Sequence, residues 1–217
     1  MALVAGCIDA IAFVNAGVFP ANMTGNLVVL ATSLVNKTAI HRESHATLVL
    51  LGFCCGSALA AMAIRSHQAV WSRSVNLVIL LAGFLLIGCG ISMGKGTVGF
   101  SLMHLFIIAS AMGMQGAAVL HLNFPGAGTT TAVTSTLTSM ITRTVHHLRG
   151  ALLPGFIVLL PAPWFPLMVF TTYFLGALLG GMQSGIHATI AAVLCGVLLS
   201  LVALAAEFLP KKREEAS

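Results

Sequence analysis

Long apolar runs separated by short polar stretches dominate the chain. Six of the runs reach about the 20 residues that a helix needs to cross a bilayer. They cover residues 1–19, 46–65, 75–93, 98–120, 164–183 and 186–208. The pattern predicts an all-α, polytopic transmembrane helical bundle with about six full spans, in which Pro210 closes the last helix.

Two shorter segments, residues 24–36 and 127–142, carry many hydroxyl and amide side chains, and nine of the sixteen residues in the second are Ser or Thr. The first segment follows Pro20, which lacks an N–H donor and disfavours helix at Phe19. We therefore expect the first span to end near Val18 and a short helix, capped by Asn22 or Thr24, to begin after it. Irregular backbone at membrane depth must be buried in protein or line a cavity, which applies to the stretch around Pro20. The second segment, rich in Ser and Thr, should be enclosed by other helices.

The two halves of the chain show similar features in the same order. The matched features are Ala5, Asp9 and Ala12 with Ala111, Gln115 and Ala118; Phe19-Pro20 with Phe124-Pro125; Thr24-Gly25-Asn26-Leu27 with Thr134-Ser135-Thr136-Leu137; and the pair Gly52 and Gly56 with the pair Gly176 and Gly180. We interpret this order as an internal duplication, a common feature of transporters. The first repeat covers residues 1–95 and the second 96–210, each with a long span, a short helix and two long spans, and residues 211–217 form a tail.

Composition excludes a soluble domain, because 58% of the residues are hydrophobic and 7% are charged, against about 25% charged in soluble domains. The ten Lys and Arg residues are scattered between the apolar runs. This is typical of loops that orient a membrane protein and not of nucleic-acid binding.

If the short segments return to the side that they enter, the repeats are inverted and seven of the ten Lys and Arg residues lie on the C-terminal side. If the short segments cross the membrane, the repeats are parallel and eight of the ten Lys and Arg residues lie on the C-terminal side. Both counts predict a multi-pass protein of the cell (inner) membrane with a cytoplasmic C-terminus.

Asp9 is the acidic residue that lies well inside a span, where a charge costs about 2.5–3.5 kcal/mol on insertion scales. It suits proton coupling or ligand binding; the alternative is a structural carboxyl bonded to Asn and Thr side chains.

Tyr173 fits anchoring near the membrane interface. The histidines, among them His41 and His45, stand beside basic residues typical of interfaces, and we expect no metal and no cofactor. The chain has no Ser/His/Asp or Cys/His pairing typical of a catalytic site, so we do not expect an enzyme.

The run Gly6-Cys7-Ile8-Asp9-Ala10, followed by Phe13, Phe19 and Met23-Thr24-Gly25-Asn26, resembles the signature of the YoaK-like bacterial membrane proteins. Gly113-Met114-Gln115 resembles the second motif of that family. The chain differs at Gly116, where the family often has Asn, and at Ser135, where it tends to have Gly. The family is a domain of unknown function, so the resemblance implies a polytopic inner-membrane protein and no particular substrate.

These features together predict a small-solute permease or secondary transporter with a central polar site. The residues expected to bind the solute or ion are Asp9, Asn22, Thr24, Gly25, Asn26, Gln115, Thr134 and Thr136. The alternative is a non-transporting scaffold or sensor for a partner protein. The expected partners are the lipid bilayer and a small solute or ion. The Gly-xxx-Gly pairs allow close helix packing within one chain, which we favour, or between two copies in a homo-oligomer.

Overall fold

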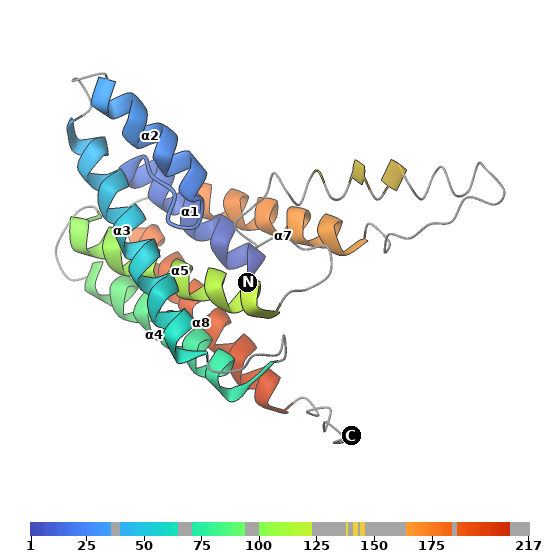
Figure 1. Ribbon diagram of the computed structural model, residues 1–217. Coiled ribbons are helices and arrows are strands. Elements are labelled where there is room, and N and C mark those ends of the chain that lie inside the picture. Colours follow the sequence, from blue (N-terminus) through green and yellow to red (C-terminus); the bar gives the residue numbers. More distant parts are fainter. Residues whose placement is uncertain are drawn as a thin grey trace.

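The computed structural model describes residues 1–35, 40–64, 71–93, 100–122, 164–183 and 186–208, with a few positions between 138 and 145. All the elements in these ranges are helices (Figure 1). They are α1 (Ala2–Ala16), α2 (Met23–Val35), α3 (Ile40–Ala63), α4 (Arg73–Met93), α5 (Leu102–Leu122), α7 (Trp164–Gly181) and α8 (Ile186–Phe208). The all-α prediction is confirmed for this part of the chain.

Each of the six apolar runs forms a helix, but only four of the described helices are long and apolar enough to cross a membrane alone. These are α3, α4, α5 and α8. The expected six full spans are therefore not confirmed. Helix α1 is short because Gly17 adopts a left-handed conformation, with φ 71°, and its N–H bonds to the Phe13 carbonyl. This is a common helix end.

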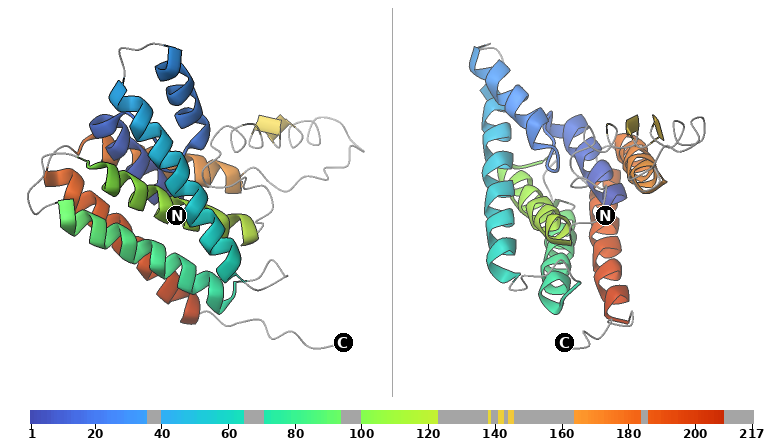
Figure 2. Two further views of the ribbon diagram at one scale, coloured as in Figure 1. Left: turned by 60° about the vertical axis from the view of Figure 1, so that its left-hand side comes forward. Right: turned by 45° about the vertical axis from the view of Figure 1, so that its right-hand side comes forward.

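The first short segment is also a helix, α2, whereas residues 127–142 lie almost entirely outside the described residues. Helix α2 runs onward in the direction of α1. Its first turn lies beside the middle of α1, because the backbone of Ala21 contacts Asp9. Helix α3 then packs along α2 and meets the end of α1, where His45 contacts the carbonyl of Ala16. The first 35 residues thus form one broken path, and its second part, α2, lies at the edge of the bundle against α3 (Figure 2). Only Asn26 and Ser33 of α2 are buried.

Glycines set the close contacts between helices that are distant in sequence. A Cβ added at Gly52 or Gly56 of α3 would lie 2.5 or 2.0 Å from a backbone carbonyl oxygen of α5. Likewise, a Cβ at Gly176 or Gly180 of α7 would lie 2.0 or 2.2 Å from a carbonyl oxygen of α1. Contacts advance in the same direction along both partners, so α3 and α5 are parallel, as are α1 and α7. The Gly-xxx-Gly pairs therefore pack within one chain, as expected.

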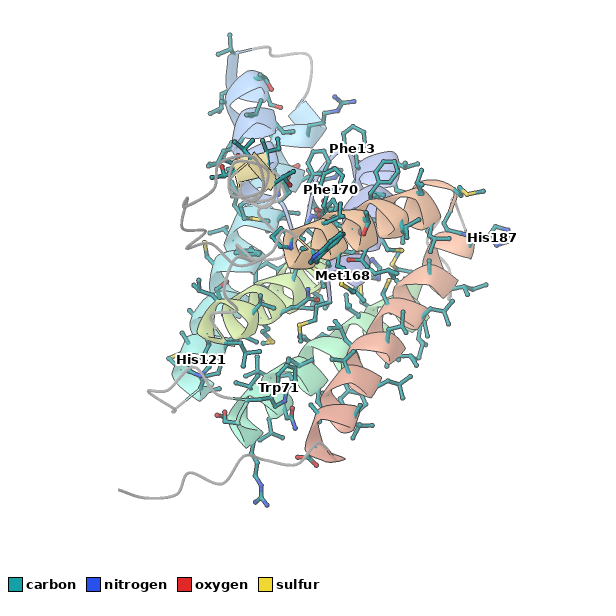
Figure 3. All side chains as sticks on the ribbon, turned by 90° about the vertical axis from the view of Figure 1, so that its right-hand side faces the viewer. Phe13, Trp71, His121, Met168, Phe170 and His187 are labelled. Atoms are coloured by element: carbon teal, nitrogen blue, oxygen red, sulfur yellow. The ribbon has the colours of Figure 1, made fainter. Side chains whose placement is uncertain are left out.

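The buried core lies mainly among α1, α4, α5 and α8, and a smaller cluster joins the end of α1 to α3 and α5. The outward faces carry large apolar side chains, such as Val28, Leu77 and Phe84, each more than 60% exposed. A surface of this kind suits contact with lipid chains better than contact with water. Trp71 and His121 lie at one end of the bundle and His187 at the other (Figure 3).

The glycine contacts make a direct prediction about stability. We expect Gly56→Ala to lower the free energy of unfolding by about 1–3 kcal/mol, the usual cost of overpacking, because the Cβ would overlap the Ser110 carbonyl. Gly88→Ala on α4 is the matched control, since a Cβ there meets nothing within 4 Å. It should leave stability unchanged or raise it slightly. Unfolding of both variants in mild detergent under SDS titration measures the difference, and equal stability would contradict this account.

Candidate functional site

Asp9 lies at the centre of the predicted site and is almost fully buried, at 3% exposure. Its Oδ1 accepts a hydrogen bond of 2.6 Å from the backbone N–H of Ala21, in the turn between α1 and α2. Its Oδ2 accepts one of 2.7 Å from the hydroxyl of Tyr173 on α7. One carboxyl group therefore joins the middle of α1, the start of α2 and a helix from the other half of the chain.

Asn26 closes the same turn from the side of α2. This side chain is fully buried, and its amide pairs with both backbone groups of Phe19. Its Nδ2 donates to the Phe19 carbonyl at 2.6 Å, and its Oδ1 accepts from the Phe19 N–H at 2.9 Å. Pro20, the next residue, has no N–H to satisfy. Both backbone groups of Phe19 thus have partners within the protein, as irregular backbone inside a membrane protein requires.

Gly25 provides space for the ring of Phe19. A Cβ at Gly25 would lie 2.9 Å from Cδ2 of that ring, and the ring stacks on Phe13 with centroids 4.8 Å apart. Gly25 therefore has a packing role in this structure. Its small size lets the turn fold back onto the first turns of α2.

Asn22 caps α2, in agreement with the prediction. Its Oδ1 accepts a hydrogen bond of 3.3 Å from the Gly25 N–H and one of 2.7 Å from the Thr24 hydroxyl. Asn22 is half-buried and Thr24 is exposed. Both side chains line a cavity, so they are accessible to a small molecule in a way that Asn26 is not.

Gln115 lies apart from this cluster. It is buried in α5, and its Nε2 donates a 3.3 Å hydrogen bond to the carbonyl of Met1, at the opposite end of α1 from the turn. Its Oε1 has no partner among the described residues. Thr134 and Thr136 lie outside the described residues. The structure therefore brings Asp9, Asn22, Thr24, Gly25 and Asn26 together and places Gln115 elsewhere.

Tyr173 belongs to the site, although the sequence pattern suggested an interfacial anchor. The residue is three positions before Gly176 on α7, which packs closely against α1. Gly6 makes this approach possible, because a Cβ there would lie 2.1 Å from the Tyr173 carbonyl oxygen. The available signal was the chain's single tyrosine near a glycine pair. It does not identify a partner 164 residues away.

The chemistry of the site is that of a buried hydrogen-bond acceptor. Both Asp9 oxygens accept from neutral donors, and no Lys or Arg among the described residues pairs with them. Such a carboxyl can take up a proton or exchange a donor when a neighbouring group moves. Within the described ranges, no group of three or more His, Cys, Asp or Glu side chains is arranged to hold a metal.

The pairing of Asn26 with Phe19 predicts that this side chain stabilises the turn. Asn26→Ala leaves the Phe19 N–H unpaired and the Phe19 carbonyl with only its 3.3 Å bond from the Asn22 N–H, so the free energy of unfolding should fall by about 1–3 kcal/mol. Asn15→Ala is the control, because the exposed Asn15 amide bonds only to a carbonyl of its own helix. Thermal unfolding in detergent compares the two variants. A loss of stability no larger than that of Asn15→Ala would rule out this role for Asn26.

Comparison with known proteins agrees with the membrane character of the fold. A family model described as "Protein of unknown function (DUF1275)" matches residues 1–205. The chain is also 30% identical over 146 residues to the UPF0700 transmembrane protein YoaK of Bacillus subtilis (strain 168). That match covers 65% of this chain and 63% of the relative, so it spans less than two thirds of the relative's length. None of the solved structures matches the chain. The chain belongs to the DUF1275 family of YoaK-like transmembrane proteins, whose function is unknown.

Proposed function

We propose that this protein is a small-solute permease or secondary transporter of the cell (inner) membrane. The observation that carries the proposal is the buried carboxyl of Asp9, which joins a broken helix path to a helix of the other half. Broken helices that meet at a repeat interface form the binding sites of many secondary transporters. An acidic side chain inside a membrane protein is costly, which favours a functional role.

The pairing of the helices supports an inverted duplication. Helices α1 and α5, which open the two proposed repeats, run in opposite directions. Gln115, late in α5, bonds to Met1, whereas Leu105 and Ala109, early in α5, pack in one cluster with Ala12, late in α1. The close pair α3 and α5 has a counterpart in α7 and α1, as expected if the two repeats exchange contacts. Helix α2 continues the path of α1, which favours three crossings in each repeat over four.

The same contacts refine the match between the repeats. Gly52 of α3 contacts Phe106 of α5, and Gly176 of α7 contacts Leu3 of α1. If α3 corresponds to α7, then Phe106 and Leu3 are equivalent positions of the two repeats. They are 103 residues apart. Asp9 and Gln115 are 106 residues apart, which is a displacement of about one helical turn. The second repeat therefore has no acidic side chain at the level of Asp9 on α5, where Met112 stands. In this proposal the coupling chemistry resides in the first repeat.

Asp9 would couple solute movement to protons through its two bonds. When the carboxyl is ionised, it holds the Ala21 amide and the Tyr173 hydroxyl together, which fixes α7 against the start of α2. Protonation removes charge from the acceptor and weakens both bonds. The start of α2 could then move relative to α7. A bistable contact of this kind is what a proton-coupled transporter requires.

Asp9→Asn tests the coupling in proteoliposomes loaded with a pH-sensitive dye. Gradients of small neutral, anionic and cationic solutes are applied, and the internal pH is followed. We expect a transported solute to move protons with the wild-type protein. Asp9→Asn should reduce the pH dependence of that flux by about 5- to 150-fold, the usual range for coupling between two sites.

Tyr173→Phe is the matched control, because it removes one bond to the carboxyl and leaves the titrating group in place. It should change the rate of flux while the pH dependence persists. Full pH dependence in Asp9→Asn would overturn the coupling role. If the wild-type protein moves none of the solutes, the permease proposal itself fails in favour of a scaffold or sensor.

The inverted arrangement also predicts the sidedness of two loops. In a variant whose five native cysteines are replaced by serine, Lys37→Cys and Arg149→Cys should react with a membrane-impermeant maleimide from opposite sides. Arg149 should be cytoplasmic, together with the C-terminus, because most Lys and Arg residues then lie on that side. Labelling of intact cells and of inverted vesicles measures this. Labelling of both positions from one side would favour eight crossings and parallel repeats.

A further inference from the structure

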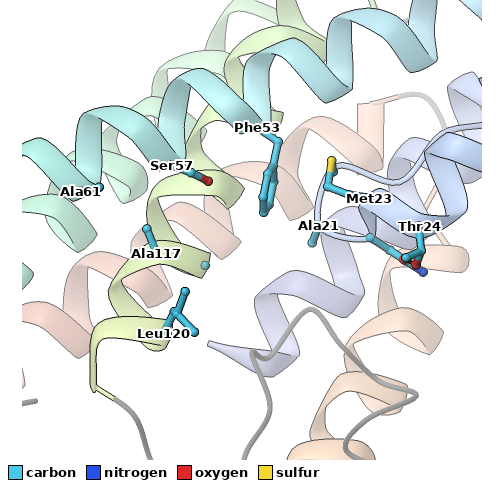
Figure 4. Close-up of a pocket in the computed structure, with 10 residues that line it drawn as sticks. Ala21, Met23, Thr24, Phe53, Ser57, Ala61, Ala117 and Leu120 are labelled. Carbon is cyan, nitrogen blue, oxygen red and sulfur yellow. Dashed lines mark hydrogen bonds between the residues drawn. The ribbon is translucent and has the colours of Figure 1, made fainter.

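A cavity of about 450 Å³ lies beside the turn between α1 and α2 (Figure 4). Residues from the turn and the start of α2 form one wall, and α3 and α5 form the others. Phe53 points from α3 toward Ala21 and Met23, while Ala117 and Leu120 face it from α5. The volume falls within the range of about 300–1,000 Å³ that is typical of small-molecule sites.

Most of the cavity wall is apolar, and small residues create the space. Ala61, Gly116 and Ala117 stand where larger side chains would fill it. A Cβ at Gly116 would meet the Phe53 ring at an ordinary distance of 3.5 Å, so this ring lies directly over the α5 backbone. A ligand with an apolar body would lie against the Phe53 ring and beside Ala117 and Leu120 of α5.

The polar groups of the cavity lie on two sides, with Thr24 beside the turn and Ser57 on α3 beyond Phe53 (Figure 4). The Oδ1 of Asn22 already accepts two hydrogen bonds, but its Nδ2 donates to no group among the described residues. On the far side the Ser57 hydroxyl donates to the Gly113 carbonyl. At the end with Asn22, the Thr24 hydroxyl donates to Asn22, which leaves its lone pairs free. This end therefore offers N–H donors to an oxygen atom and can accept one hydrogen bond from a hydroxyl.

The surroundings disfavour a charged ligand. No charged side chain lines the cavity among the described residues. A cation would lack a counter-charge, and an anion would lie beside the turn whose Ala21 amide is already bonded to the Asp9 carboxyl. Placing an unpaired charge in an apolar site is costly, whereas a neutral group that makes its hydrogen bonds is not.

We propose that this cavity binds an uncharged solute with an apolar body and one hydroxyl or carbonyl oxygen, which bonds to the amide of Asn22. That this molecule is also transported rests on the proposed permease function. Asn22 and Phe53 are then the residues that set specificity, the first for the oxygen atom and the second for the apolar body.

The test is binding of three probes of one shape to the full-length protein in nanodiscs, followed by fluorine NMR. The probes are 4-fluorobenzyl alcohol, 4-fluorobenzoate and 4-fluorobenzylammonium. We expect saturable binding of the alcohol and binding of the two ions that is weaker by about tenfold or more, because neither charge finds a partner. Empty nanodiscs correct for partition of the probes into lipid.

Ala117→Phe, which fills the cavity, should abolish saturable binding of the alcohol. Ala58→Phe is the matched control, because it adds the same ring to an exposed position on α3 outside the cavity. If Ala117→Phe fails to fold by thermal unfolding, Ala61→Phe fills the same space from α3. Asn22→Asp keeps an oxygen to cap α2 and removes the N–H donors, so it should weaken binding by about tenfold, as expected for one hydrogen bond.

Equal binding of all three probes, or binding of the alcohol that Ala117→Phe leaves unchanged, would overturn this inference. Saturable binding without solute flux in proteoliposomes would support the inference and overturn the permease function. Flux of charged solutes only, without binding of the alcohol, would support the permease function and overturn this assignment of its substrate.

Discussion

The need to satisfy backbone polar groups within the membrane governs this structure. The chain leaves helical geometry at Gly17 and resumes it at Met23, so several N–H and carbonyl groups between them lose their partners within a helix. No water is available in hydrocarbon to replace those partners. Two buried side chains supply several of these partners, since Asp9 accepts from Ala21 and Asn26 pairs with both backbone groups of Phe19. Asp9 and Asn26, which belong to the family signature, therefore have a structural role at the helix break before any role in binding.

The close approach of α7 to α1 depends on glycine and in turn completes the site. Gly6, Gly176 and Gly180 let the two backbones come together, so the hydroxyl of Tyr173 reaches the second oxygen of Asp9. A carboxyl held only by the turn would be a local structural feature. Once it is also held by α7, its protonation state bears on how the two ends of the chain pack. Packing of small residues and the chemistry of the site are therefore parts of one arrangement.

The sequence predicted those parts of the site whose partners are close along the chain. Proline, glycine and asparagine near residue 20 indicated a helix break, and the structure confirms the break and the Asn22 cap. Tyr173 was missed because its bond to Asp9 depends on three-dimensional packing that no local pattern records. Gln115 was grouped with Asp9 by its spacing, but a difference of one helical turn directs it to Met1 instead. Six full spans remain a prediction, because only α3, α4, α5 and α8 among the described helices are long and apolar enough to cross alone.

The parallel pairing of α1 with α7 has a consequence for synthesis in the cell. The face of α1 that carries Gly6 and Asp9 is completed only when residues near 173–180 have emerged, more than 150 residues later. At translation rates of about 5–20 residues per second, α1 waits for roughly 10–30 s. During that interval a polar carboxyl and an open glycine groove are exposed to lipid or to the insertion machinery. Helix α1 is thus made before most of the helices described here and is among the last of them to reach its native surroundings.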